Sequence, residues 1–210
     1  GYLFGVMASQ QVAGAQAKGV YAFMKHFALN DQETNRLSEL ATWANEQSIR
    51  EIYLKPFEMS VKQGGAGAVM SAFNYIGMEW GGSHSGLLNT VLRGEWGFRG
   101  FAISDFNLYP YMNPNEGIAA GTDLTLTFAP SKSFNDTSSA KAQTDMRNAT
   151  HNILYTVANS NAMNGMAAGA TVDYTPPMWV YMQIGVSVVV GVLIAGGVFM
   201  VTRRVLKHRK

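Results

Sequence analysis

The sequence contains no cysteine and carries little charge. Of its 210 residues only 14% are charged, and the formal net charge at pH 7 is +2. The lack of cysteine excludes disulfide bonds, thiolate nucleophiles and cysteine-based zinc sites. Four scattered histidines without a His-x-x-x-His pair predict no metal site, and we expect no cofactor. The near balance of charge gives no reason to expect nucleic acid as a partner.

The length of the chain suits one ordinary domain or a piece of a larger protein. The first residue is Gly1, and the first recognisable element already lies in the middle of a pattern. Nothing at this end has the composition of a signal peptide. We therefore expect the sequence to be a fragment or a processed product.

The C-terminal region contains a long uncharged stretch, from Met178 to Val201. A stretch longer than about 20 apolar residues predicts a transmembrane helix, whereas a buried core helix rarely runs so far without a polar face. Aromatic residues lie at one end and basic residues at the other: Tyr174, Trp179 and Tyr181, then Arg203, Arg204, Lys207, Arg209 and Lys210. We therefore predict a lipid-embedded span at 178–201, preceded by a Gly- and Ala-rich linker at 164–177. The positive-inside rule predicts that the basic tail at 202–210 is cytoplasmic. The protein is thus expected in the cell membrane as a single-pass protein, with residues before Pro176 outside the cell.

Hydrophobic periodicity predicts helices and strands that alternate along residues 1–163. Helical spacing favours helices at 6–18, 37–54, 87–96, 115–120 and 142–157, and we expect Pro56 to stop the second of them. Apolar runs favour strands at 20–27, 68–72, 101–104 and 124–128. This alternation is typical of βαβ units in an α/β fold. Four strands are half of an eight-stranded barrel, so we predict the C-terminal half of a (β/α)8 TIM-like barrel, followed by the single transmembrane helix. Because a half barrel has two exposed edges, we expect the missing strands upstream in the parent chain.

One predicted strand ends in a carboxylate. The small and apolar run from Gly100 to Ser104 is followed by Asp105. The carboxyl end of a buried parallel strand is where α/β barrels place their chemistry. Taken alone, Asp105 is equally consistent with a cap of the following turn.

Four motifs together carry a resemblance to a known family. They are Lys25-His26-Phe27-Ala28-Leu29-Asn30-Asp31-Gln32-Glu33, Val69-Met70-Ser71-Ala72-Phe73-Asn74, Leu92-Arg93-Gly94-Glu95-Trp96-Gly97-Phe98-Arg99-Gly100 and Ile103-Ser104-Asp105-Phe106. In this order they resemble glycoside hydrolase family 3, the family of β-glucosidases and related exo-acting enzymes. The resemblance implies hydrolysis of O-glycosyl bonds with retention of configuration, with Asp105 as the catalytic nucleophile.

The resemblance also implies substrate-binding residues. Lys25 and His26 match the family's paired sugar-binding residues, and Arg36 falls where a further sugar-contacting Arg is often found. Fixed cationic donors suit sugar hydroxyl groups and a developing oxyanion. Strict strand alternation sends Lys25 and His26 to opposite faces, so the strand must end or distort if both line the site. Without the family motifs, a Lys-His pair is typical of a solvated strand end.

Three further residues match the walls of the sugar site. Met70 and Phe73 match the subsite of the non-reducing sugar, and plain core packing is the alternative interpretation for both. Phe73 stands where many members have Tyr, which removes one hydroxyl group. Phe106 stands where the family usually has Trp, which keeps an aromatic surface without the indole N–H.

The second carboxylate of such an enzyme is not located by the sequence. In the family the acid/base usually lies on an α/β sandwich domain that follows the barrel. Here the linker and the predicted membrane span follow, so either that domain precedes the barrel in the parent chain or the acid/base is absent. The His-Asp loop of the N-acetylhexosaminidase branch is not matched, which disfavours aminosugar substrates.

Three functional hypotheses remain open at this point. The first is a membrane-anchored β-glucosidase-like enzyme that acts on a β-linked glucoside or oligosaccharide in carbohydrate catabolism. It would need the upstream half barrel and the acid/base domain, so this chain alone is expected to be inactive. The second is a non-catalytic, membrane-anchored carbohydrate-binding protein with a degenerate glycosidase fold. The third is a membrane-anchored interaction module without a role in sugar binding.

Overall fold

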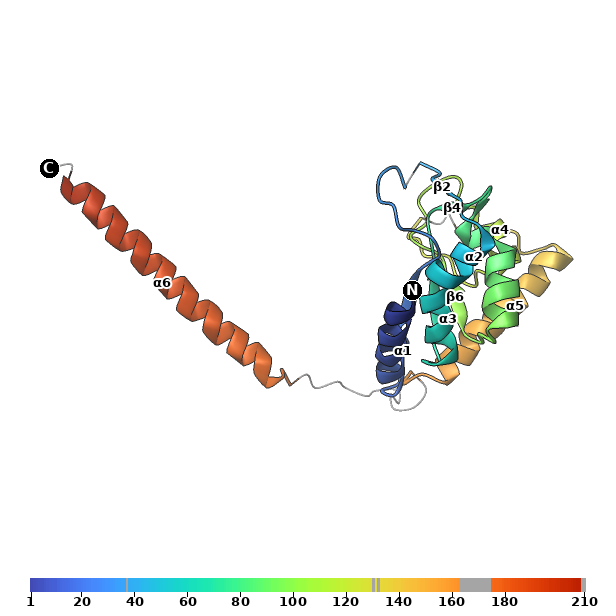
Figure 1. Ribbon diagram of the computed structural model, residues 1–210, viewed down its shortest axis with the longest axis horizontal. Coiled ribbons are helices and arrows are strands. Elements are labelled where there is room, and N and C mark those ends of the chain that lie inside the picture. Colours follow the sequence, from blue (N-terminus) through green and yellow to red (C-terminus); the bar gives the residue numbers. More distant parts are fainter. Residues whose placement is uncertain (37, 130, 132, 163–174, 209–210) are drawn as a thin grey trace. The chain divides into compact units, whose positions relative to one another are not determined.

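The computed structural model describes residues 1–36, 38–129, 131, 133–162 and 175–208. The chain divides into two units, Gly1–Met166 and Ala167–Lys210. The first is an α/β unit and the second contains one long helix, α6 (Met178–His208) (Figure 1). Most of the predicted linker lies outside the described residues, at 163–174.

The first unit is built on a parallel sheet of three strands in the order β1-β3-β6. The strands are β1 (Phe23–Phe27), β3 (Ala68–Ser71) and β6 (Phe101–Ile103). They confirm the strands expected near 20–27, 68–72 and 101–104. The fourth expected strand, 124–128, is reduced to a parallel bridge between Ile103 and Leu124.

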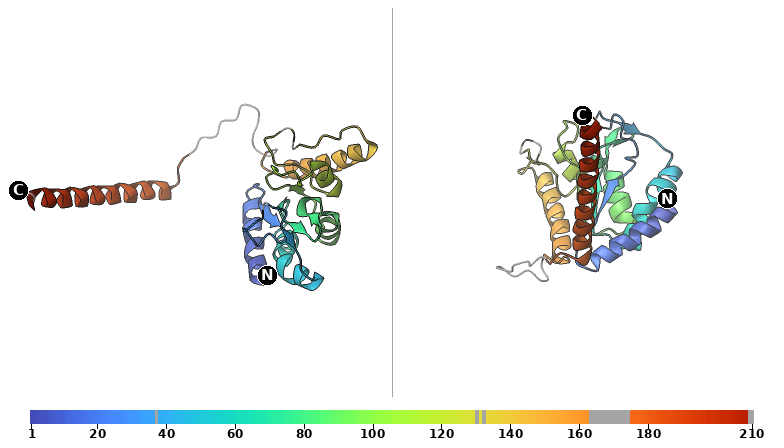
Figure 2. Two further views of the ribbon diagram at one scale, coloured as in Figure 1. Left: turned by 90° about the horizontal axis from the view of Figure 1, so that it is seen from above. Right: turned by 90° about the vertical axis from the view of Figure 1, so that its left-hand side faces the viewer.

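Helices surround this sheet (Figures 1 and 2). The helix α1 (Tyr2–Gln16) packs against α3 (Lys55–Lys62), where Gly5 leaves room for Met59. The π-helical segment η3 (Gly86–Glu95) follows β3, and α4 (Pro114–Ala120) and α5 (Ala140–Ala158) follow β6. Asn113 and Ser139 cap α4 and α5, since their side-chain oxygens accept hydrogen bonds from the first-turn N–H groups of Asn115 and Ala142.

The segment between β1 and β3 differs from the expected helix at 37–54. Residue 37 lies outside the described residues, and Ala41–Thr42 forms a short strand, β2. This strand pairs with β4 (Tyr75–Ile76), which forms a hairpin with β5 (Glu79–Trp80). The short 3₁₀ segment η2 (Gly81–Ser83) follows this hairpin. Pairing with distant residues has overridden the helical pattern.

Helical structure in this region begins only after Asn45, whose side chain caps α2 (Glu46–Ser48). The π-helical segment η1 (Ile49–Tyr53) continues directly from α2. The helical segment η1 ends at Tyr53, before Pro56, as expected, and a separate helix, α3, then begins. Pro56 lies in the first turn of α3, where a backbone N–H has no helical partner to lose.

The main hydrophobic core lies between the sheet and the helices. Phe27 of β1 is fully buried and makes edge contacts with Phe57 and Trp96, at centroid distances of 5.1 and 5.9 Å. Leu88 and Leu92 of η3 complete the same cluster. Packing in this core holds the strands in fixed positions against the helices, and so determines where the end of each strand lies.

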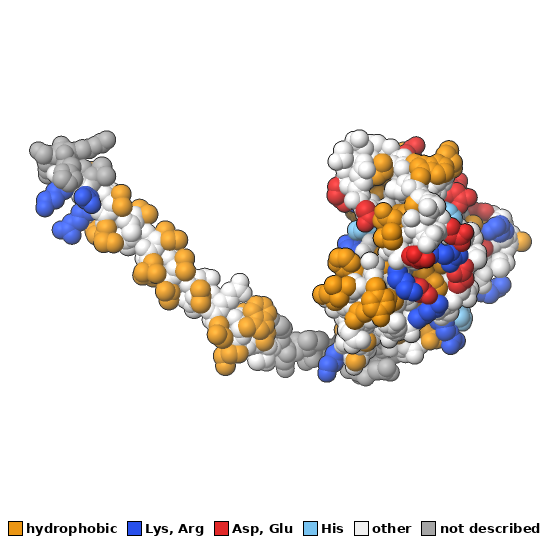
Figure 3. Space-filling model, viewed as in Figure 1, with side chains coloured by type: hydrophobic (Ala, Val, Ile, Leu, Met, Phe, Trp, Pro, Cys, Tyr) orange, Lys and Arg blue, Asp and Glu red, His pale blue; other side chains and the backbone are white. Residues whose placement is uncertain are grey.

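The helix α6 has the length and composition of a membrane-spanning helix. Its segment Met178–Arg204 contains 27 residues, and the most apolar 18-residue window within it has a mean hydropathy of 2.6 and no buried residue. Hydrophobic side chains cover its length and basic side chains lie near one end (Figure 3). The predicted span at 178–201 and the first part of the predicted tail belong to one continuous helix. The membrane assignment itself stays a prediction.

Two glycines give a matched test of the packing. A methyl group on Gly100 would overlap the carbonyl of Gly67, whereas one on Gly14 of α1 would meet no atom within 4 Å. We predict that Gly100→Ala lowers the free energy of unfolding by at least about 2 kcal/mol because the backbones must separate. Gly14→Ala should raise it by about 0.5–1 kcal/mol through helix propensity. Urea unfolding of the chain in detergent, followed by circular dichroism, measures both; equal effects would contradict this packing.

Candidate active site

Asp105 lies directly beyond the carboxyl end of β6 and is only 7% exposed. Its Oδ1 atom accepts a hydrogen bond from the backbone N–H of Phe106 at 2.7 Å. Its Oδ2 atom is buried and has no hydrogen-bond donor among the described residues. Buried polar atoms are nearly always paired, so this oxygen is an exception among the described residues.

His26 of β1 faces that oxygen. The distance from its Nε2 atom to Oδ2 of Asp105 is 3.3 Å. Burial lowers the pKa of His26 below its ordinary value of 6.5, and the charges of Lys25 and Arg36 lower it further against the opposing effect of Asp105. At pH 7 the imidazole is therefore neutral, and its contact with Asp105 is a polar contact rather than an ion pair.

An irregularity in β1 accompanies this contact. Met24 pairs with Val69 and Phe27 with Ser71, so three steps along β1 match two steps along β3. Such a bulge turns side chains away from simple alternation. It falls at Lys25 and His26, where a distortion of the strand was expected.

Lys25 takes a different position from His26. It is exposed and lines a cavity of about 440 Å³ together with residues of α1, β1 and α3, such as Val12 and Phe57. Among the described side chains, Lys25 makes no ion pair with Asp105. The structure thus brings His26, and not Lys25, against the carboxylate.

Arg36 and Phe73 lie together. The guanidinium of Arg36 stands over the ring of Phe73 at 4.9 Å, and its Nε atom is 2.7 Å from Glu33. Phe73 is 7% exposed and packs with Trp80 and Met112 in a second, smaller hydrophobic cluster. A cation over an aromatic face is favourable, so Phe73 stabilises the position of Arg36 in addition to packing in this cluster.

Met70 and Phe106 occupy the remaining predicted positions. Met70 of β3 is half-buried and lies opposite Ile103 in the sheet register. The half-buried Phe106 packs its ring 5.2 Å from that of Phe128, which is 77% exposed. Both therefore flank the end of β6 from which Asp105 emerges.

Sequence patterns did not single out Tyr111. Its hydroxyl group is buried without a hydrogen-bond partner among the described residues, and its ring stacks on Tyr109 at 5.9 Å. Burial, followed by neighbouring groups that include Tyr109 and Asp105, raises the pKa of Tyr111 to about 12. The hydroxyl therefore stays protonated at neutral pH. The one available signal was the aromatic composition of the segment after Asp105.

Comparison with known proteins assigns the described α/β unit to a family. Residues 2–145 match the model of the glycosyl hydrolase family 3 N terminal domain. The chain belongs to glycoside hydrolase family 3.

Curated relatives carry the name β-glucosidase. The chain is 40% identical over 125 residues to β-glucosidase B of Emericella nidulans, which covers 60% of this chain and 14% of that protein. It is 40% identical over 115 residues to a β-glucosidase of Rhizobium radiobacter, again covering 14% of the relative. The chain thus spans a small part of the length of these relatives.

Solved structures show the same fold. β-Glucosidase 3B from Thermotoga neapolitana, determined in complex with glucose, matches with a TM-score of 0.66 and 35% identity over 76% of this chain and 24% of that one. A β-glucosidase from Kluyveromyces marxianus, also in complex with glucose, matches with a TM-score of 0.67 and 26% identity over 80% of this chain.

The contact between His26 and Asp105 can be tested by titration. We predict that His26 titrates below its ordinary value of 6.5, because the buried imidazole resists a charge. Asp105→Asn should lower its pKa further, since the carboxylate is the main opposing influence. NMR of the imidazole, assigned with a His26→Gln variant, measures both values.

The sign of the linked stability follows from the same shift. Because the unfolded chain binds this proton more tightly than the folded one, protonation of His26 destabilises the fold as pH falls below about 6.5.

An unchanged or higher pKa of His26 in the Asp105→Asn variant would contradict the contact between these two residues.

Proposed function

We propose that this chain is the nucleophile-bearing part of a retaining β-glycosidase, similar to the β-glucosidases, with a β-linked glucoside or oligosaccharide as its substrate. The observation that carries the proposal is the state of Asp105. In this family 3 domain, the buried carboxylate of Asp105 follows a strand end, and its Oδ2 atom has no hydrogen-bond donor among the described residues. The same oxygen faces the neutral imidazole of His26.

The proposed reaction has two steps. Oδ2 of Asp105 attacks the anomeric carbon while the bond from that carbon to the leaving oxygen breaks, and an acid protonates the leaving group. Water then attacks the same carbon and gives its proton to the residue that acted as the acid. The bond from that carbon to Oδ2 of Asp105 breaks, which regenerates the carboxylate and releases the sugar with its configuration retained. The hydrogen bond from Phe106 to Oδ1 holds the carboxylate in one orientation during both steps.

His26, Arg36 and Lys25 are proposed to bind the sugar. Near Asp105, the neutral imidazole of His26 offers a hydrogen bond to a hydroxyl group, and Arg36 supplies a fixed positive charge over Phe73. Lys25 would have to move its flexible side chain toward the site. Met70, Phe73 and Phe106 would form apolar walls against the sugar ring.

The rest of the sugar site is proposed to come from residues outside this chain. Among the described residues β1 pairs only with β3, which leaves one strand edge open. On the neighbouring α1, Tyr2, Leu3 and Phe4 are 68%, 69% and 72% exposed. An open edge beside exposed apolar residues supports a (β/α)8 barrel whose other half lies upstream in the parent chain. The same upstream part would supply the acid/base, so this chain alone should not hydrolyse glycosides.

We also propose that α6 anchors this domain to the outer face of the cell membrane. Its length and mean hydropathy support a single span. The basic residues at its C-terminal end support a cytoplasmic tail. The substrate would then be met outside the cell.

Substitution of Asp105 tests the proposed reaction. In the full-length polypeptide, Asp105→Asn should lower kcat on an aryl β-glucoside by about 10³-fold or more, because no covalent intermediate can form. A slow-turnover 2-fluoroglucoside should label a peptide that contains Asp105. Glu95→Gln is a matched control, since Glu95 is an exposed carboxylate paired with Arg50 and should leave activity unchanged.

Two outcomes would contradict this reaction. Labelling of another carboxylate would overturn the assignment of Asp105. Saccharide binding by the full-length protein without any turnover would favour the non-catalytic carbohydrate-binding protein instead.

The membrane topology has a separate test. We predict that the chain inserts through α6 with its N-terminal unit on the outer face, because insertion requires only the apolar helix and its flanking charges. Protease added outside intact cells should digest an epitope tag placed before Gly1 and spare one placed after Lys210. Replacement of Arg203, Arg204 and Lys207 by Glu should weaken this orientation. Protection of the N-terminal tag would contradict the proposal.

A further inference from the structure

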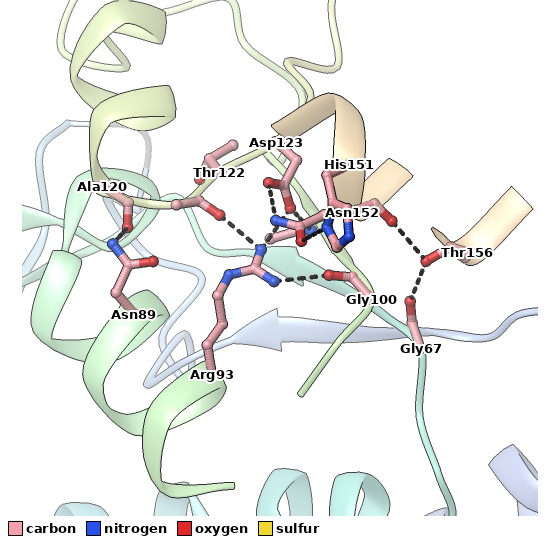
Figure 4. Close-up of polar contacts among 12 residues, drawn as sticks. Gly67, Asn89, Arg93, Gly100, Ala120, Thr122, Asp123, His151, Asn152 and Thr156 are labelled. Atoms are coloured by element: carbon pink, nitrogen blue, oxygen red, sulfur yellow. Dashed lines mark hydrogen bonds and ion pairs between the residues drawn. The ribbon is translucent and has the colours of Figure 1, made fainter. Parts of the chain in front are cut away.

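A partly buried polar cluster lies beside β6, the strand that precedes Asp105 (Figure 4). Arg93 comes from η3, Asp123 follows α4 and Asn152 comes from α5. The side chains of Arg93 and Asp123 are 17% and 3% exposed, and Arg93 Nη2 lies 2.6 Å from Asp123 Oδ2. Three elements far apart in the sequence therefore meet at one ion pair.

Arg93 links the backbone at Gly100 to the backbone at Gly121. Its Nη1 donates a hydrogen bond to the carbonyl of Gly100 at 2.8 Å, and its Nη2 donates to that of Gly121 at 3.2 Å. One guanidinium thus holds the start of β6 beside the end of α4. Both positions require glycine, since Gly121 has φ +107° and a methyl group on Gly100 would overlap Gly67.

Asp123 holds β6 itself. Its Oδ2 accepts a hydrogen bond from the N–H of Ala102 at 2.7 Å, and its backbone N–H donates to the carbonyl of Ala102 at 2.8 Å. Its Oδ1 accepts a hydrogen bond from Asn152 at 2.9 Å. Each carboxylate oxygen therefore has a donor, in contrast to Oδ2 of Asp105, so this carboxylate is built for structure rather than reaction.

The residues that follow Asp123 then run alongside Asp105. The N–H of Ser104 donates to the carbonyl of Leu124 at 2.9 Å, and the N–H of Asn107 donates to that of Leu126 at 2.8 Å. The backbone is thus tied immediately before and shortly after Asp105. Because Asp123 sets the register of this segment against β6, a shift at Asp123 would be passed to Asp105.

We infer that Arg93, Asp123 and Asn152 are positioning residues that set the place of the Asp105 carboxylate along β6. The inference rests on the proposed function for Asp105. The cluster touches β6 from outside the sugar-binding residues, so its loss should lower kcat and leave KM nearly unchanged. A displacement of about 1 Å at a reacting group can cost about 10²-fold in rate.

The test uses Asp123→Asn and Asn152→Ala in the full-length polypeptide. We expect Asp123→Asn to lower kcat on an aryl β-glucoside by about 10–100-fold, with KM within about threefold of wild type. Asn152→Ala removes one hydrogen bond and should give a smaller loss in the same direction. In both variants, hydrogen exchange of a peptide covering residues 101–107 should be faster, at a temperature well below each melting point.

The exposed ion pair between Arg50 and Glu95 is the matched control. It makes a hydrogen bond of 2.6 Å without contacting β6, so Glu95→Gln should change neither kcat nor exchange in this peptide. Variants with a lower melting temperature but wild-type kcat and exchange would overturn the inference. Should Asp123→Asn not fold, Asn152→Ala decides by the same two measurements. An inactive wild-type protein would refute the proposed function; unchanged exchange in the variants would then still refute the positioning role.

Discussion

The candidate site depends on the parallel pairing of β1, β3 and β6. Parallel strands present their carboxyl ends at one edge of a sheet, and here this brings His26 from the first strand to within 3.3 Å of Asp105, which follows the last. The core behind the sheet holds the strands at matching heights through Phe27 and Leu88. The bulge in β1 then turns His26 toward the carboxylate. Without this register the two residues would have no reason to meet.

Two carboxylates near β6 differ in how their oxygens are paired. Asp123 is paired with Arg93, Asn152 and the N–H of Ala102, so its oxygens have donors. Asp105 receives one backbone hydrogen bond and keeps its other oxygen unpaired. An unpaired buried carboxylate oxygen costs stability. Such a cost fits the role proposed for Asp105, because strain of this kind is typical of functional sites.

Sequence reasoning predicted the central strands, several helices and the place of Asp105 just after a strand, because apolar runs and the family motifs are local signals. It predicted a helix where β2 forms, because a strand of two residues is fixed by its partner β4 and not by its own pattern. It could not assign the cluster of Arg93 and Asp123, which lie 30 residues apart and meet only in the fold. The separation of Lys25 from His26 depends on the exact position of a bulge, which alternation suggests but does not specify.

Retention of configuration is the most direct test of the central claim that Asp105 acts as a nucleophile in family 3 chemistry. The full-length protein would hydrolyse an aryl β-glucoside inside an NMR tube, and the anomeric proton of the first glucose released would be recorded before mutarotation. A covalent intermediate on Asp105 requires two inversions at the anomeric carbon, so the account predicts that β-glucose appears first. Initial appearance of α-glucose would mean direct attack by water and would contradict it.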